Sequence, residues 1–438
     1  MTTQFTPPLM HQITPLIPSN SNPSATNTNI TDTNSWLKFP TSKKALGGFS
    51  LGDGNCMEQL LVHCANAIES NDVTLAQQIL WVLNNIAPPD GDSNQRLAST
   101  ILRALTSRAA KSGSSKMLAA VARAHHPALP THTFSVIDFA SFVDVTPWHR
   151  FGFTAANSAI LEATEGFSVI HIVDLSLTRC MQIPTLIDAI ASRHNNHNHS
   201  NNDVVLPPPL IKLTVASLAH VIIPPTLDLS YDELGTKLVN FARSKNVTME
   251  FTTIPCTHAD GLAALIHYIR AHRYVTTTEE ALIINCHMML HCIPDETLPS
   301  AATTSSSCLR SMFLTALRGL DPTLVVLVEE DADLTSCDLV GRLRSAFNYM
   351  WIMYDTVDTF LARGSKQRQW YEGNVRWKIE NVIAEEGIER VERLESKSRW
   401  ERRMREAEFQ GIGFSDDAVS EVKGMLEEHA AGCTCTGQ

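Results

Sequence analysis

Several features that mark common classes of protein are missing from this sequence. No apolar run reaches the ~20 residues that a membrane-spanning helix needs. No run near the N-terminus resembles a signal peptide. The nucleophile turn G-x-S-x-G, the zinc motif H-E-x-x-H and the phosphate-binding P-loop are also absent. The sequence therefore gives no indication of a membrane protein or of the hydrolase and nucleotidase classes that carry these motifs.

Basic residues are in the minority. There are 35 Lys and Arg against 46 Asp and Glu, which gives a formal net charge of −11. A domain whose main partner is bare nucleic acid usually carries a basic face, so this balance argues against that role. The ten cysteines are scattered through mostly apolar surroundings. This pattern is typical of reduced, buried thiols and predicts an intracellular protein.

The composition divides the chain into regions. Residues 1–52 are rich in Thr, Ser, Asn and Pro, which predicts a disordered tail. Residues 53–125 have helical spacing and predict a helical cap, and residues 126–432 predict an α/β core. In the cap, one apolar stripe combines residues spaced by three and four: Leu60, Leu61, Cys64, Ala65 and Ile68. Such a stripe packs against its own protein or serves as a docking face for a partner, and the spacing alone leaves both readings open.

Strand-like runs alternate with helical segments after residue 167. The runs cover 168–174, 210–216, 247–253, 281–286 and 323–329, and helical patterns near 184–193, 231–243, 259–272 and 308–319 separate them. Near-continuous apolar strands joined by helices indicate a mostly parallel sheet with both faces covered. The expected fold class is therefore α/β, with a mostly parallel sheet covered on both faces by helices.

The first of these strands, which ends at Asp174, lacks the loop that such a unit uses to bind a cofactor. The residues after it read LSLTRCMQ and contain no glycine, although backbone N–H groups must approach a phosphate closely. The second strand is followed by no carboxylate for a ribose. Both observations argue against S-adenosylmethionine-dependent methyl transfer and predict no catalytic or cofactor-binding residues.

Two further clusters contain residue types that bind metals or phosphates. The stretch CHMMLHC at 286–292 offers zinc ligands, but it leaves a strand and has no Cys-x-x-Cys partner, so ordinary packing is favoured and no metal is predicted. The stretch KSRWERRMR at 397–405 is the densest basic segment and carries Arg399, Arg402, Arg403 and Arg405. It is either a basic patch for phosphate contacts or a helix whose charges pair with neighbouring glutamates.

Several long motifs together resemble the GRAS family of plant transcription regulators, in its scarecrow-like branch. IHIVD at 170–174 followed by MQIPTLIDAIASR resembles the family's VHIID block, which supplies Ile170, His171, Ile172, Val173, Asp174, Gln182 and Pro184. MEQLLVHCANAIESND at 57–72 resembles its leucine-rich region, ALIINCHMMLHCIPDE at 281–296 its Val-Asn-Cys block, and IENVIAEEGIERVERLESKSRWERRMREAEF at 379–409 the block ending in Trp-Arg-x-Arg-Met. The similarity covers about 53–429 in register.

The resemblance implies a methyltransferase-like Rossmann fold with a helical cap, used as a protein-docking platform rather than as an enzyme. It implies a nuclear regulator of plant development that joins DNA-binding factors, zinc-finger proteins among them, at promoters and pairs with other family members. Direct sequence-specific DNA binding is the alternative. Under this resemblance the leucine-rich stripe is a candidate docking face, and Asp174 is expected to accept N–H bonds where its strand turns.

The sequence also departs from the family pattern. Ile183 stands where a tryptophan is usual, and the N-terminal hormone-response motif is absent. At 433–438 the chain reads CTCTGQ instead of continuing into a Trp-Lys-Gly…Ser-Ala-Trp block that forms a closing strand. A missing final strand leaves backbone groups unpaired, so we expect lower stability than in a version with that block restored.

Overall fold

The computed structural model describes residues 54–111, 133–144, 146–200, 207–218, 223–273, 280–295 and 308–434. These residues belong to one compact unit, 50–438. The tail predicted for 1–52 and the boundary predicted at 125 lie outside the described residues.

Five parallel strands form the central sheet. They are β2 (Val169–Ser176), β3 (Leu210–Leu218), β5 (Met249–Cys256), β6 (Glu280–His287) and β7 (Leu324–Val328). Their order across the sheet is β5-β3-β2-β6-β7, and every neighbouring pair is parallel. All five correspond to strands that the sequence predicts, because buried parallel strands appear as short continuous apolar runs. The predicted α/β class with a methyltransferase-like Rossmann core is confirmed.

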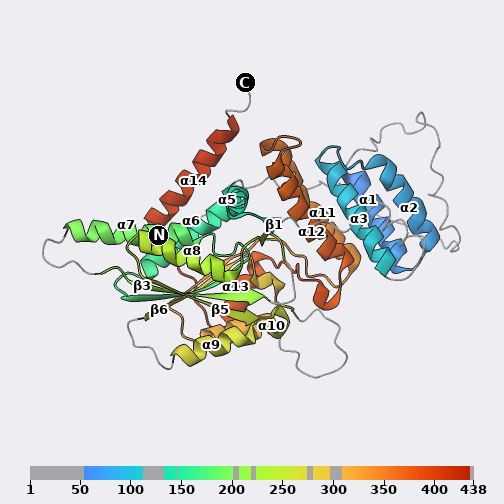
Figure 1. Ribbon diagram of the computed structural model, residues 1–438. Helices are drawn as coiled ribbons and strands as arrows, with labels where there is room; N and C mark the ends of the chain where they lie inside the picture. The colour runs from blue at the N-terminus through green and yellow to red at the C-terminus, as the bar shows by residue number, and fades with distance from the viewer. Residues whose placement is uncertain are drawn as a thin grey trace, which may run out of the picture. The chain divides into compact units, whose positions relative to one another are not determined.

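Helices cover both faces of this sheet. On one face, α6 (Pro147–Ala163), α7 (Ile183–Ser200) and α8 (Tyr231–Ser244) pack on alternate strand residues such as Ile170 and Ile172. On the other face, α9 (Ala263–Arg273), α10 (Leu309–Arg318) and α13 (Lys397–Glu406) pack on residues such as Val173 and Ile284 (Figure 1). The alternation of strand side chains thus divides the sheet's core into two clusters.

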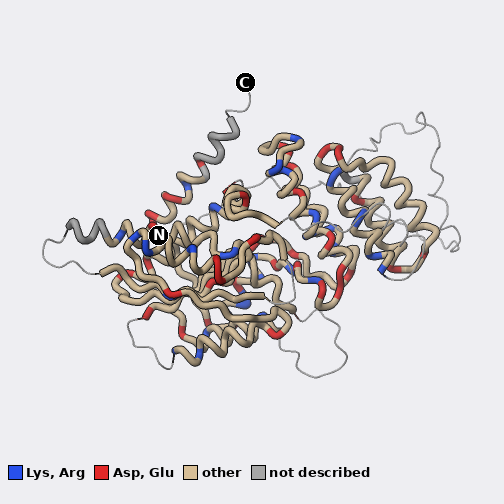
Figure 2. The backbone as a smooth tube through the Cα atoms, in the orientation of Figure 1, with Lys and Arg blue, Asp and Glu red and all other residues tan. Residues whose placement is uncertain are grey.

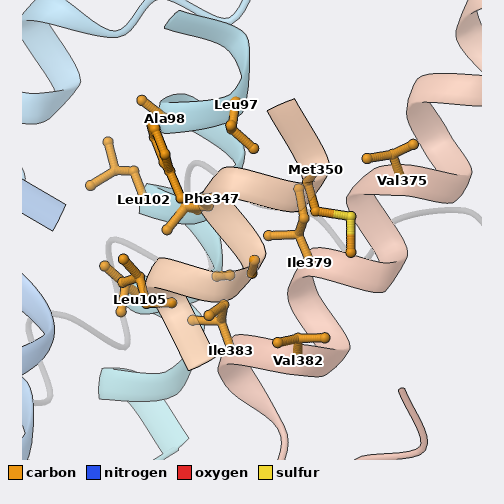
Figure 3. Packing of buried hydrophobic residues seen from close by; sticks show 14 of the residues in the cluster. Leu97, Ala98, Leu102, Leu105, Phe347, Met350, Val375, Ile379, Val382 and Ile383 are labelled. Carbon is orange, nitrogen blue, oxygen red and sulfur yellow. The ribbon is translucent and has the colours of Figure 1, made fainter. Parts of the chain in front are cut away.

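A helical bundle forms a third hydrophobic cluster. It contains α1 (Gly54–Glu69), α2 (Val73–Ile86) and α3 (Ser93–Lys111), together with α5 (Val136–Asp144), α11 (Leu339–Phe360) and α12 (Lys366–Ala384). Figure 3 shows how α3, α11 and α12 meet: Leu97 and Leu105 lie beside Phe347, Met350 and Ile379. Helix α3 begins with a reciprocal pair in which Asp92 and Gln95 each bond the other's backbone N–H.

The bundle also includes helices from outside the region predicted as the cap. Helices α11 and α12 follow β7 in sequence, so they fall within 126–432, yet their apolar faces are part of the cap's core. Their dense alternating charges indicate a solvated face, but their buried stripes pack on α1 and α3. The bundle is thus built from segments that lie far apart in the chain.

The remaining elements are short or peripheral. A two-stranded parallel pair joins β1 (Thr133–Phe134) and β4 (Thr226–Leu227), and α14 (Asp416–Thr434) packs along α6. The Glu421 carboxylate of α14 accepts a hydrogen bond from Ser158 of α6 at 2.8 Å. None of the helices described has the length and apolar character required to span a bilayer.

Candidate functional site

The strand order places a topological switch point between β2 and β6. From β2 the chain builds outward through β3 and β5, and it then returns to add β6 and β7 on the other side. Ligands of doubly wound sheets bind beyond the carboxyl ends of the strands at this point. In the register of the sheet Asp174 lies opposite Asn285, and Ser176 lies opposite His287.

The side chains at the switch point bond to one another. Asn285 donates from Nδ2 to Asp174 Oδ1 at 2.8 Å and to Gln182 Oε1 at 3.0 Å. Gln182 donates in turn to Asn157 of α6 at 3.0 Å. Exposed fractions of 1% for Asp174 and 0% for both Asn285 and Gln182 show that the network is enclosed. This network therefore fills the crevice at the switch point with amide and carboxylate groups of the protein itself.

The second oxygen of Asp174 is also occupied. Ser176 Oγ donates to Asp174 Oδ2 at 2.6 Å, and Cys180 Sγ donates to the same oxygen at 3.3 Å. Burial raises the pKa of the Asp174 carboxyl, while the hydrogen bonds from Ser176, Asn285 and Cys180 act in the opposite direction. Both oxygens are therefore used internally.

The loop after β2 keeps a tight turn without glycine. Arg179 and Cys180 adopt φ values of 46° and 62°, in the left-handed region that glycine enters at least cost. Their side chains take up the space beside the turn: Cys180 is buried, and the Arg179 guanidinium lies 5.0 Å from the centroid of the Tyr231 ring. The absence of glycine from this loop is visible in the sequence, but the positive φ angles of Arg179 and Cys180 are not.

The other residues of the IHIVD motif lie elsewhere in the sheet. Ile170 and Ile172 face one core cluster and Val173 faces the other. His171 sits toward the amino ends of the strands, where Nε2 is 2.9 Å from Thr214 Oγ1 and Nδ1 is 3.3 Å from Glu280 Oε1. Burial lowers the pKa of His171 although Glu280 acts against it. His171 and Asp174 are therefore separate sites, while Gln182 joins Asp174 and Pro184 lies in the first turn of α7.

The CHMMLHC stretch divides between two different partners. His287 Nε2 lies 3.0 Å from His149 Nδ1 of α6, whereas His291 Nδ1 lies 2.7 Å from Glu329 Oε2. Burial lowers the pKa of His149, and it lowers the pKa of His287 to about 3, so both rings are neutral at pH 7. Among the residues that the structure describes, no group of three His, Cys, Asp or Glu side chains is placed to hold a metal ion.

A buried charge network, which the sequence did not reveal, connects the sheet to the bundle. Lys378 of α12 binds both oxygens of Glu330 at 2.7 and 2.8 Å. Burial lowers the pKa of His291, but Cys292, Glu329 and Glu392 raise it by more, so the net shift is well upward. Lys378 and His291 hold the pKa of the buried Glu392 below its usual value, despite the opposing effect of its burial. The glutamates after β7 therefore pair with cations and are not free carboxylates.

The candidate docking stripe faces inward. Leu61, Cys64 and Ala65 have 0% exposure and Ile68 has 8%, while Leu60 is partly buried against the same cluster. Their contacts are with the protein's own bundle, so in this conformation the stripe has almost no exposed surface for a partner. Of the two readings that the spacing left open, self-packing is the one that the structure shows.

The candidate basic patch is divided. Arg403 forms a two-point contact with Glu395 at 2.6 and 2.7 Å, and Arg399 donates to Thr335 Oγ1 at 2.6 Å. Arg402 and Arg405 are exposed. Trp400, which follows Arg399 in the chain, is buried, and its ring centroid lies 5.6 Å from the guanidinium carbon of Arg310, so it fixes the helix to the core. Two of the four arginines thus point into the protein.

Comparisons with known proteins agree on one family. The sequence model of the GRAS domain family matches residues 57–436. The chain is 58% identical to Scarecrow-like protein 32 of Arabidopsis thaliana over 90% of each chain. It is 30% identical to Protein SHORT-ROOT of the same plant, over 86% of this chain and 67% of that one. It is 29% identical to Scarecrow-like transcription factor PAT1, also of Arabidopsis thaliana, over 84% of this chain and 69% of that one.

One solved structure supports the fold. The crystal structure of SCL7 in Oryza sativa superimposes with a TM-score of 0.61 at 23% identity, over 85% of this chain and 90% of that one. At this level of identity the likeness shows the fold alone.

Proposed function

The chain belongs to the GRAS domain family, and from that premise we propose that it is a nuclear regulator of transcription in plant development. In this proposal it acts as a docking scaffold that joins DNA-binding factors, zinc-finger proteins among them, at promoters. Pairing with other family members is part of the same proposal. The name of one relative, Scarecrow-like transcription factor PAT1, supports the transcriptional role.

The observation that carries the scaffold role is the filled switch point. Asp174 uses both carboxylate oxygens for Asn285, Ser176 and Cys180, and Gln182 closes the space toward α6. A cofactor would have to break this enclosed network, and each buried polar group left unpaired costs about 1–3 kcal/mol. The geometry therefore favours a scaffold over a methyltransferase.

The charge distribution supports an adaptor over a direct DNA reader. Acidic and basic residues intermingle along the described backbone (Figure 2). Helix α13, which has five Lys or Arg among its ten residues, uses Arg399 and Arg403 for internal contacts. Direct DNA binding stays as the second candidate because Arg402 and Arg405 are exposed on the same helix.

One binding experiment separates these functions. Fluorescence anisotropy of the full chain with DNA duplexes should show no sequence preference that survives about 200 mM salt. Adding a zinc-finger factor bound to its own site should then recruit the chain. Tight, sequence-selective binding by the chain alone would overturn the adaptor role.

A matched pair of variants locates any DNA contact. The double substitution Arg402→Glu with Arg405→Glu should leave recruitment by the partner unchanged if the chain is an adaptor. The control, Lys237→Glu with Arg243→Glu, reverses two exposed charges on α8. Loss of promoter binding in the first variant and not in the second would support direct DNA contact.

The methyltransferase alternative has its own test. S-adenosylmethionine should give no binding heat in calorimetry, and a measurable affinity would support that alternative.

A further inference from the structure

Residues 390–395, which read RVERLE, bring four charged side chains into the interior of the protein. The segment has no regular secondary structure, and all six of its residues are buried. Two of its charges, Arg390 at 2% exposure and Arg393 at 0%, form the arginine pair. A buried guanidinium has lost the water around its charge and around its N–H groups. It therefore needs an anion and several hydrogen-bond acceptors.

The arginine pair bonds only backbone carbonyls among the residues that the structure describes. Arg390 Nη1 donates to the carbonyls of Leu334 and Ser336 at 3.5 and 3.3 Å. Arg393 Nη2 donates to the carbonyl of Gly387 at 2.5 Å. The Nε atoms of both arginines and Nη1 of Arg393 are buried and have no acceptor among those residues. Three nitrogens are thus left without the hydrogen bonds that water would supply, which is unfavourable for each of them.

Other buried arginines of this region do have carboxylate partners. Arg310 of α10 donates to Glu395 at 2.6 Å, and Arg342 of α11 bonds the Glu386 carboxylate. Arg403 also binds Glu395, at 2.6 and 2.7 Å, so two cations share that acid. Within the described part of the chain, neither member of the arginine pair forms an ion pair with a carboxylate. The pair therefore lacks the direct anionic contact that the neighbouring arginines have.

The electrostatics show the same deficit of negative charge. The pKa of Arg393 is lowered to about 10 by its burial and by the charges of Arg390 and Arg310. Burial also lowers the pKa of Arg390, and Arg342 acts in the same direction. Asp295 opposes both shifts, but the net shifts stay downward. The described residues thus supply less negative charge than the arginine pair requires.

The arginine pair lies beneath a surface turn and away from β7. The turn is η4 (Gly387–Glu389), in which Ile388 is 50% exposed. Because Arg393 bonds a carbonyl of this turn, its guanidinium lies directly under it. Burial lowers the pKa of His258, and Arg393 acts in the same direction, so these two side chains are neighbours. His258 follows β5, which is the edge strand opposite β7.

The missing interactions specify the chemistry of an occupant. A buried water molecule supplies acceptors but no charge. A side chain of a partner protein needs an open cleft, whereas the arginine pair is at most 2% exposed. Phosphate and sulfate are small, carry one or two negative charges, and offer several oxygens that match guanidinium N–H groups. Two guanidiniums beside one carboxylate, Asp295, leave a positive charge that such an ion offsets.

We propose that Arg390 and Arg393 hold a small inorganic oxyanion of the phosphate type as a structural ion of the fold. The Nε groups of both arginines and Nη1 of Arg393 donate to its oxygens, and its charge offsets the two guanidiniums. The ion binds the folded chain, in which the two arginines are brought together, and stabilises it by mass action. The inference goes beyond the proposed function and does not depend on the role in transcription.

Binding is tested on the full chain after exhaustive dialysis into Hepes and sodium chloride. Phosphate added at constant ionic strength should bind once per chain in calorimetry and should raise the thermal midpoint, whereas added chloride should not. Ion chromatography of the denatured chain detects an oxyanion that survives dialysis. If no oxyanion is retained and neither phosphate nor sulfate binds, water fills the site and the proposal is wrong. An equal rise with chloride would also overturn it.

Paired variants locate the ion. Arg393→Lys keeps the positive charge but loses the guanidinium donors, so it should weaken phosphate binding by about tenfold or more. Arg368→Lys is the matched control, because Arg368 is also buried but is paired with Asp358 and Glu372. It should lower stability and leave phosphate affinity unchanged. Arg390→Lys provides a second variant if Arg393→Lys does not fold. Parent-like binding in the arginine-pair variants would place the ion elsewhere and refute the proposal.

A heavier analogue of sulfate shows the position of the ion directly. In crystals of the full chain grown with selenate, the anomalous signal of selenium should lie between the two guanidiniums. The selenate oxygens should be about 2.7–2.9 Å from the guanidinium nitrogens. A signal found only on the protein surface would mean an adventitious ion only and would overturn the proposal. The DNA and recruitment experiments do not depend on this ion, so the two proposals can fail independently.

Discussion

At the scale of single residues, Asp174 shows how the site of a cofactor scaffold becomes part of a core. Its carboxylate accepts bonds from Asn285, Ser176 and Cys180, and it is buried. All these partners come from β2, the following loop and β6, which meet only in the folded sheet. The loop accommodates the arrangement by placing Arg179 and Cys180 at positive φ.

Replacing Asp174 with asparagine tests this network. In Asp174→Asn the new amide nitrogen faces the donors that the carboxylate now accepts, so one buried donor is left unpaired. We expect a loss of about 2 kcal/mol in the free energy of unfolding, measured by urea denaturation. Asp188→Asn on the exposed side of α7 is the control and should change it by less than about 0.5 kcal/mol. Equal effects would show that the network contributes no special stability.

At the scale of elements, α6 is pressed against the ends of β6 and β7. A Cβ atom on Gly152 would lie 2.7 Å from His287 Cε1 and 2.9 Å from Val328 Cγ1. The His149–His287 contact lies in the same place, and Phe153 packs against the His287 ring at a centroid distance of 4.9 Å. Close approach of this helix to the sheet therefore depends on the absence of a side chain at one position.

A pair of glycine substitutions measures this constraint. Gly152→Ala should destabilise the protein by about 1–3 kcal/mol because His287 and Val328 must move. Gly373→Ala in α12 has no neighbour within 4 Å of the new Cβ and should stabilise it by about 0.4–1 kcal/mol. Thermal and urea unfolding of both variants provide the comparison. A stable Gly152→Ala protein would mean that α6 is free to shift.

The two neutral histidines predict a pH dependence of stability. The folded-state pKa of His287 is about 3, and that of His149 is also lowered, against an ordinary value near 6.5. Above the ordinary value neither state binds the proton, so the full stability is present. As pH falls below it, the unfolded state binds protons that the folded state refuses, and stability falls by about 1.4 kcal/mol per pH unit for each histidine.

His291 acts in a different window. Its folded-state pKa is raised, so its contribution is present below the ordinary value and is lost as pH rises through the raised pKa. Urea unfolding at roughly pH 7.5, 6.5 and 5.5 measures the loss of stability at low pH that His149 and His287 are expected to cause. His287→Gln should reduce the slope between the lower two values, since all other titrating groups are shared with the parent chain. An unchanged slope would show that His287 is protonated in the folded protein.

At the scale of the whole described unit, the bundle and the sheet share one stretch of chain. Helices α11 and α12 leave the sheet after β7, join α1 and α3, and return through residues 391–395, which are buried. Asn381 holds this return by accepting the N–H groups of Val391 and Glu392, each at 2.9 Å. Lys378 adds its pair with Glu330 at the end of β7. Cap and core are therefore tied at several points.

This connection predicts a single cooperative unfolding transition. Circular dichroism and amide exchange, followed separately in α3 of the bundle and β2 of the sheet, should report the same midpoint in urea. Asn381→Ala leaves two buried backbone donors unpaired and should lower that midpoint for both parts together. Separate midpoints, or an effect of Asn381→Ala on the bundle alone, would show that cap and core are independent.

The sequence by itself determined the parts that depend on local pattern. Strands β2, β3, β5, β6 and β7 and the helices between them follow from the spacing of apolar residues, because that spacing is set by the geometry of each element alone. The missing glycines after Asp174 were equally visible, and several long motifs together identified the family. None of these inferences depends on which elements contact one another in the folded protein.

Only the tertiary structure decided which faces meet. The stripe containing Leu61 has the same spacing whether it packs inside the bundle or binds a partner, so its burial could not be predicted from the sequence. The same holds for the joining of α11 and α12 to the cap, for the partners of Asp174, and for the pairing of Arg403 with Glu395. The physical reason is that burial and hydrogen bonding depend on residues distant in the chain, whereas periodicity records only that an apolar face exists.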